Sequence, residues 1–150
     1  MKILIDADGC PVVDIAVKTA KDNNLECIIL CDTAHIFHKD GAKTITVSKG
    51  ADSVDFALVN MVQNGDIVIT QDYGLAAMCL SKRAVVIHQD GMIYSDDNIE
   101  ALLGFRHTAK KIRNSGGRLK GHPKRTHEQD EAFTITINSI INAEKQQGNP

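Results

Sequence analysis

Five short apolar runs recur through the first ninety residues of the chain, separated by longer and more polar segments. Each run is nearly continuous and rich in β-branched residues, which is typical of strands buried on both faces of a sheet. The runs are KILI at 2–5, LECIIL at 25–30, KTITV at 43–47, DIVIT at 66–70 and AVVIH at 84–88. The pattern therefore predicts five buried strands.

The segments between these strands carry helical patterns. Residues 11–23 begin with Pro11, which suits the first turn of a helix. Residues 51–63 place their apolar side chains on one stripe. Regular alternation of strand and helix predicts a mostly parallel sheet with right-handed crossovers and with helices on both faces. We therefore expect an α/β sandwich of three layers.

The pattern changes after the fifth run. Asp90 and Gly91 form a two-residue hairpin signal, which predicts that the fifth strand turns back into a short antiparallel edge strand. Asp97 and Glu100 then have the spacing of a capping box, so we expect Asp97 to cap a helix that becomes basic toward Asn114.

A loop and a final helix complete the predicted order of elements. The loop spans 118–125, and Thr126 with Gln129 has the spacing of a second capping box, which predicts a helix at 126–146. The chain has no internal repeat, low-complexity tract or convincing linker. We expect residues 1–150 to form a single domain.

Composition excludes several classes of protein. Of 150 residues, 43% are hydrophobic and 24% are charged, which excludes a disordered chain, a collagen-like repeat and a small disulfide scaffold. No apolar run approaches the roughly 20 residues of a membrane helix, and the amino terminus has no cleavable signal pattern. We expect a cytoplasmic protein that does not bind membranes. The four cysteines form no CxxC pair, so we expect buried free thiols and no zinc or redox site.

Positive charge is concentrated in one segment, although the net charge is only −2. Residues 106–127 carry nearly half of all lysines and arginines and no acidic residue. Such a run is often a solvated surface, but it also suits an anionic partner. The residues that we expect to contact phosphates are Arg113, Arg118, Lys120 and Lys124.

Acidic residues follow most of the predicted strands. In an open parallel sheet, ligands bind outside the carboxyl ends of the strands. The acids expected at that edge are Asp6 and Asp8 after the first strand, Asp32 after the second, Asp52 and Asp55 on the helix after the third, and Asp72 after the fourth. Because clustered carboxylates repel one another, they need a cation, and hard oxygen ligands favour Mg²⁺ or Mn²⁺.

A simpler interpretation is that Asp8, Asp52 and Asp72 cap the helices that they precede. Capping does not account for Asp6 and Asp8 two residues apart, or for Asp55 inside a first turn. Tyr73 directly follows Asp72 and is the aromatic residue best placed to stack on a nucleic-acid base. We interpret His88, at the end of the fifth strand, as a surface residue.

Several blocks of sequence resemble one family of bacterial proteins. The blocks are ILIDADGCPV, GADSVDFAL followed by GDIVITQDYGLA, and RNSGGRLKGHP with EQDEAF downstream. Together they resemble the YaiI/YqxD family over nearly the whole chain, and that family is similar to the PIN and NYN group of metal-dependent ribonucleases. The resemblance implies a PIN-like domain with strand order 3-2-1-4-5, a divalent cation and an RNA partner.

The resemblance also implies roles for individual residues. It makes Asp6 the first metal ligand, Asp52 or Asp55 the acid on the helix, and Asp72 the acid after the fourth strand. We therefore expect a Mg²⁺- or Mn²⁺-dependent ribonuclease in which cation-activated water attacks a phosphodiester. The residues expected to hold the cation are Asp6, Asp55 and Asp72, and the supporting residues are Asp8, Asp52 and Thr70.

Two other functions stay open. One is a PIN-like protein that binds RNA without useful turnover. The other is a haloacid-dehalogenase-type phosphatase, because IDADG resembles the first motif of that family, with Asp6 as nucleophile and Asp8 as acid. Thr70, Lys82 and the pair Asp96 and Asp97 imitate its later motifs only in their order. The oligomeric state also stays open.

Overall fold

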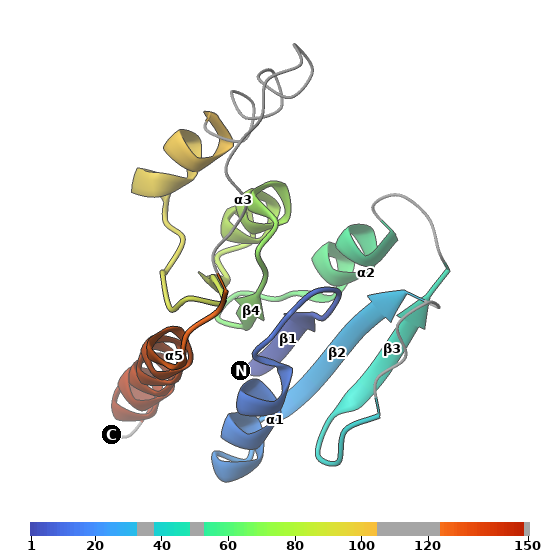
Figure 1. The fold of residues 1–150 in the computed structure, drawn as a ribbon, viewed down its shortest axis with the longest axis vertical. Coiled ribbons are helices and arrows are strands. Elements are labelled where there is room, and N and C mark those ends of the chain that lie inside the picture. The colour runs from blue at the N-terminus through green and yellow to red at the C-terminus, as the bar shows by residue number, and fades with distance from the viewer. Residues whose placement is uncertain (33–37, 49–52, 105–123, 149–150) are drawn as a thin grey trace.

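Strands and helices mostly alternate along the chain, as predicted, although no labelled helix separates the second strand from the third (Figure 1). The computed structural model describes residues 1–32, 38–48, 53–104 and 124–148. The labelled elements are β1 (Lys2–Asp6), α1 (Val13–Asp22), β2 (Glu26–Asp32), β3 (Lys43–Val47), α2 (Ser53–Met61), β4 (Ile67–Ile69), α3 (Tyr73–Ser81), β5 (Val85–Ile87) and α5 (His127–Gly148). Residues 96–104 are also helical. No helix in these ranges is long and apolar enough to cross a membrane.

The five strands form one sheet in the order β3-β2-β1-β4-β5, and every neighbouring pair is parallel. β1 lies in the middle, where Ile3 pairs with Cys27 of β2 on one side and with Ile67 of β4 on the other. The chain leaves β1 toward β2 and later returns to β4 on the opposite side. The crossovers therefore diverge between β1 and β4, which is the switch point where ligands of such sheets bind. The α/β fold and the strand order are confirmed.

The predicted antiparallel edge strand is wrong. The chain does turn at the predicted place, since the Gly91 amide donates to the carbonyl of His88 at 2.9 Å. After the turn, however, only Ile87 and Ile93 form an antiparallel bridge. The chain then enters the helix at 96–104, so no second strand can form along β5.

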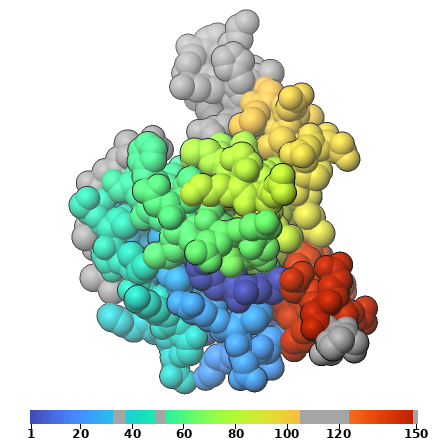
Figure 2. All heavy atoms as spheres, turned by 180° about the vertical axis from the view of Figure 1, so that it is seen from behind, coloured from blue at the N-terminus to red at the C-terminus, as the bar shows by residue number. Residues whose placement is uncertain are grey.

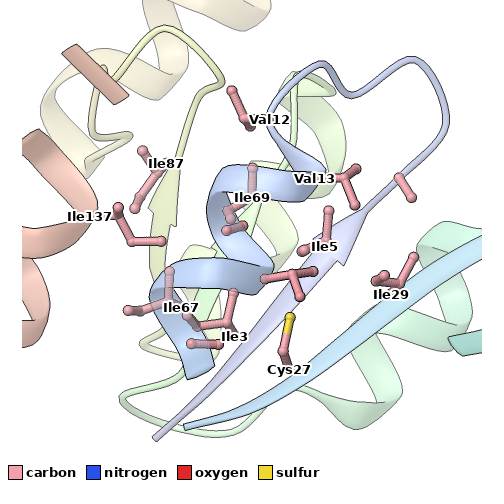
Figure 3. Packing of buried hydrophobic residues seen from close by; sticks show 14 of the residues in the cluster. Ile3, Ile5, Val12, Val13, Cys27, Ile29, Ile67, Ile69, Ile87 and Ile137 are labelled. Atoms are coloured by element: carbon pink, nitrogen blue, oxygen red, sulfur yellow. The ribbon is translucent and has the colours of Figure 1, made fainter. Parts of the chain in front are cut away.

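Helices cover both faces of the sheet and enclose two hydrophobic cores. Side chains of β1 alternate between them, with Ile3 and Ile5 on one face and Leu4 on the other. Figure 3 shows the first core, where Ile3 and Ile5 lie near Ile67 and Ile69 of β4, with α1 and α5 packed over them. α2 and α3 cover the second face, and they spread across the green side of the molecule in Figure 2. The three layers explain why the strands are apolar on both faces.

The capping box predicted for the last helix is confirmed, whereas the one predicted at Asp97 lies two residues earlier in the chain. Thr126 and Gln129 cap α5 reciprocally, because the Thr126 amide donates to Gln129 Oε1 at 2.8 Å and the Gln129 amide donates to Thr126 Oγ1 at 3.4 Å. The helix at 96–104 starts before Asp97, and the Ser95 amide donates to Asn98 Oδ1 at 2.9 Å. Ser95 is therefore the cap. The basic continuation toward Asn114 lies outside the described residues.

α5 packs closely against the turn at Gly91, and this contact predicts a large effect of a small substitution. Gly91 has φ +90°, and an added Cβ would lie 2.7 Å from the carbonyl oxygen of Ala132 on α5. Gly91→Ala should lower the free energy of unfolding by about 2–4 kcal/mol in urea denaturation, through backbone strain and overpacking. Gly65, with φ +87° and nothing within 4 Å of an added Cβ, is the matched control. Gly65→Ala should lower the free energy of unfolding by only about 1 kcal/mol. Equal losses in the two variants would contradict a tight contact between Gly91 and α5.

Candidate active site

Asp6 and Asp72 come together at the carboxyl ends of the neighbouring strands β1 and β4. Thr70 joins them, since its hydroxyl donates to Asp6 Oδ2 at 2.7 Å while its Oγ1 accepts the Asp72 amide at 3.0 Å. Thr70 is almost fully buried, so the positions of these groups are fixed by the end of β4. The predicted supporting residue Thr70 thus contacts both acids.

The electrostatics of Asp6 show that a third carboxylate is close. The pKa of Asp6 is raised from 3.8 to about 6, chiefly by burial; the Thr70 hydrogen bond opposes this shift, and the negative charges of Asp72 and Asp8 add to it. Asp6, Asp8 and Asp72 therefore form one acidic group at the switch point. Near neutral pH, Asp6 is a carboxylate held in surroundings that favour its protonated form.

Asp72 is also a helix cap, as the simpler interpretation held. Its Oδ1 accepts the Leu75 amide at 3.1 Å in the first turn of α3. Asp8 has no such role for α1, because Val12 occupies that N-cap position. Capping thus explains Asp72 in part and does not explain Asp8 or Asp6.

Asp55 lies in the first turn of α2 and is half-buried. The pKa of the Cys79 thiol is raised to about 12, chiefly by burial; the charges of Asp55 and Asp6 add to this shift and that of Lys82 opposes it. The two acids therefore influence the same buried thiol from different elements. Asp52, the alternative acid on this helix, lies outside the described residues.

The donor atoms at this edge are carboxylate and hydroxyl oxygens, which are the ligands that Mg²⁺ and Mn²⁺ prefer. Within 1–32, 38–48, 53–104 and 124–148, no group of three or more histidine, cysteine, aspartate or glutamate side chains is arranged to hold a metal ion. Mg²⁺ usually retains several waters and needs only one or two protein carboxylates. Asp6 and Asp72 are therefore the two residues at this edge that could hold such an ion.

The cysteines are free thiols, as expected: Cys27, Cys31 and Cys79 are buried and Cys10 is half-buried. Cys10 follows the first acids directly. Burial raises its pKa to about 11, the charge of Asp6 raises it, and the charge of Arg125 lowers it. A thiol, unlike a thiolate, is a poor nucleophile, so this raised pKa disfavours nucleophilic chemistry at Cys10.

The described part of the basic segment is its carboxyl end. Lys124 is exposed, whereas Arg113, Arg118 and Lys120 lie outside the described residues. Arg125, which we did not single out, donates to Asp90 Oδ1 at 2.9 Å, to the Gln89 carbonyl at 2.8 Å and to Asp130 Oδ1 at 2.8 Å. It therefore fastens the start of α5 to the turn after β5.

Sequence reasoning also missed the environment of Tyr94. This residue is buried, and its hydroxyl donates to the Thr70 carbonyl at 3.2 Å. Tyr73, the residue predicted to stack on a nucleic-acid base, packs edge-on against the Tyr94 ring. The only signal in the sequence was the position of Tyr94 in an apolar run after the turn, which indicates burial but no partner.

Comparison with known proteins identifies the family. The family model described as "Uncharacterized BCR, YaiI/YqxD family" matches residues 4–143. A "UPF0178 protein" of Ruminiclostridium cellulolyticum is 51% identical over 97% of this chain and 95% of its own length. A "UPF0178 protein" of Exiguobacterium sibiricum is 48% identical over 94% of this chain and 96% of its own length. No solved structure matches the chain significantly. The matched model and these relatives cover nearly all of the chain, which therefore belongs to the YaiI/YqxD family.

Proposed function

We propose that this protein is a Mg²⁺- or Mn²⁺-dependent ribonuclease that hydrolyses phosphodiester bonds at the carboxyl edge of its sheet. The observation that carries the proposal is the closeness of Asp6 and Asp72 at the switch point, where the Thr70 hydroxyl contacts the carboxylate of Asp6 and the backbone amide of Asp72. Two carboxylates on adjacent strand ends supply oxygen ligands for one hard cation. The position is also where ligands of open parallel sheets bind.

Each residue of the pair has a distinct task in this proposal. Asp6 binds the cation through its carboxylate while Thr70 holds that carboxylate in one orientation. Asp72 is held by its cap on α3 and brings the second carboxylate. Asp8 and Asp55 add negative charge nearby. The cation, when bound, lowers the pKa of a bound water and stabilises the charge that develops on the phosphate.

Arg125 links the basic segment to this edge of the sheet, although its own charge is paired with Asp90 and Asp130. Arg125 and Asp6 both act electrostatically on Cys10, in opposite directions. Arg125, at the carboxyl end of the basic segment, therefore lies near the same thiol as Asp6. In this proposal Lys124 and the basic residues that precede it hold the phosphates on either side of the cleaved bond.

The test is cleavage of a labelled single-stranded RNA in Mg²⁺ or Mn²⁺, compared with EDTA. Asp72→Asn is the sharpest variant, because asparagine also caps helices and so retains the Leu75 contact while it removes the charge. Its cleavage rate should fall at least about a hundredfold, since even residues that only orient metal ligands contribute about 10- to 100-fold.

Asp22→Asn is the matched control for this test. Asp22 is exposed and pairs with Lys18 at the end of α1, next to the amino ends of β1 and β2 and so at the edge of the sheet opposite the acidic group. Its variant should therefore cleave at the wild-type rate. Equal cleavage by wild type and Asp72→Asn, or cleavage that continues in EDTA, would refute the proposed function.

An RNA-binding protein without turnover is the second candidate. The cap that Asp72 forms on α3 favours it, because capping alone would account for this aspartate. RNA binding that persists in EDTA, with no cleavage in Mn²⁺, would support it. The phosphatase alternative has less support, since Lys82 lies at the opposite end of α3 from Asp72 and donates to the Val59 carbonyl at 2.6 Å.

A further inference from the structure

Both tyrosines of the chain lie beside the acidic group, although aromatic residues make up only 4% of the sequence. Tyr73 is the first residue of α3 and directly follows Asp72. Its ring meets that of Tyr94 edge-on, with 6.1 Å between the ring centroids. The His88 ring, which follows β5, meets Tyr94 in the same manner, also at 6.1 Å. Three rings therefore form a row across the carboxyl ends of β4 and β5.

The middle ring of this row is fixed. Tyr94 is 2% exposed, and its hydroxyl donates to the carbonyl of Thr70, the residue that bridges Asp6 and Asp72. The row is thereby tied to the same strand end as the two acids. A ring held in this way cannot move away from the site without breaking a buried hydrogen bond.

The two outer rings reach the surface. Tyr73 is half-buried, and the His88 side chain is 17% exposed. His88 is held by its own contact, because its Nδ1 accepts the Asp90 amide at 3.1 Å. Both rings are thus restrained by Tyr94 on one side while part of each meets solvent. Preorganised aromatic rings of this kind are the platforms on which single-stranded nucleic acids stack their bases.

We propose that Tyr73 and His88 flank the cleavage site as a base-stacking shelf, which directs the protein to unpaired nucleotides of a single-stranded nucleic acid. This inference rests on the proposed function, since it places the phosphate beside Asp72 while the neighbouring base stacks on Tyr73. Bases of a duplex are already stacked on one another and have no free face for a tyrosine ring. The shelf therefore selects single strands over duplexes.

The test measures Kd in EDTA by fluorescence anisotropy, with a labelled single-stranded RNA, the DNA of the same sequence and the RNA duplex. Tyr73→Leu removes the ring, and it should raise Kd for both single strands about tenfold, within the usual range for one stacked base. Tyr73→Phe retains the ring and should bind like wild type. His88→Asn, which retains an acceptor for the Asp90 amide, should weaken binding in the same direction.

Phe56→Leu is the matched control, because Phe56 is a 62% exposed aromatic residue on α2, outside the row of rings. Its Kd should equal that of wild type. The inference is overturned if Tyr73→Leu binds single strands as tightly as wild type, or if wild type binds the duplex as tightly as the single strand.

Adding Mn²⁺ separates this inference from the proposed function. If single strands bind through Tyr73 and are not cleaved, the shelf stands and the ribonuclease proposal fails. If RNA is cleaved but Tyr73→Leu cleaves single strand and duplex at wild-type rates, the ribonuclease proposal stands and the shelf is overturned.

Discussion

Asp6→Asn should make the protein more stable at pH 8 in the absence of divalent metal, by about 3 kcal/mol. Burial and the charges of Asp72 and Asp8 raise the pKa of Asp6 from 3.8 to about 6, and each unit corresponds to about 1.36 kcal/mol. Asparagine carries no charge and can still accept the Thr70 hydroxyl. The substitution therefore removes the cost of a buried carboxylate and retains its hydrogen bond.

The raised pKa of Asp6 also determines how the stability of the protein depends on pH. Since the pKa of Asp6 is higher in the folded than in the unfolded protein, the folded state binds more protons between these values, and stability falls as pH rises from about 4 to 6. The advantage of Asp6→Asn should be complete above about pH 6 and should vanish below about pH 4. Urea denaturation of both proteins at several pH values in EDTA measures this difference in stability. A variant that is less stable than wild type at pH 8 would contradict the account.

Asp66→Ala should lower the free energy of unfolding by about 3–5 kcal/mol, because it breaks a buried ion pair and leaves one charge without its partner. The Asp66 side chain is 5% exposed and that of Lys2 is 15% exposed. Asp66 accepts the Lys2 ammonium at 2.5 Å, the Lys2 amide at 3.0 Å and the Gln63 amide at 2.8 Å. It thus ties the first residue of β1 to the segment before β4.

The matched control for this substitution is Asp22→Ala. Asp22 pairs with Lys18 one helical turn away, and both side chains are mostly exposed. Such a pair contributes at most about 0.5 kcal/mol. Urea denaturation of the two variants should separate them clearly, and equal losses would show that Lys2 and Asp66 contribute no more than a surface pair.

Much of the fold could be predicted because its strands are short, β-branched and buried on both faces. KTITV corresponds to β3 without change, and the runs at 66–70 and 84–88 contain β4 and β5 with one extra residue at each end. The antiparallel strand could not be excluded from sequence, because the predicted turn does form and the pairing ends only where the chain enters the helix at 96–104. Contact between Gly91 and Ala132 joins segments some forty residues apart, and local patterns carry no information on it.

The acids of the candidate site were easier to predict than the residues that position them. Asp6 and Asp72 follow apolar runs, and a parallel sheet brings such ends together. Tyr94 and Arg125, which were not predicted, act through hydrogen bonds to distant residues, which depend on strand register and helix docking. His88, interpreted as a surface residue, is partly buried against Tyr94 for the same reason.

The most direct test of the account is thermal unfolding of wild type and Asp6→Asn at pH 8, in EDTA and with increasing Mn²⁺. A cation at 100 times its Kd stabilises a folded protein by about 2.7 kcal/mol, which corresponds to about 5–10 °C for a chain of this size. The account predicts that Mn²⁺ raises the Tm of wild type by this amount and leaves Asp6→Asn unchanged. A wild-type Tm that does not respond to Mn²⁺, or an equal rise in both proteins, would contradict a divalent cation site at Asp6.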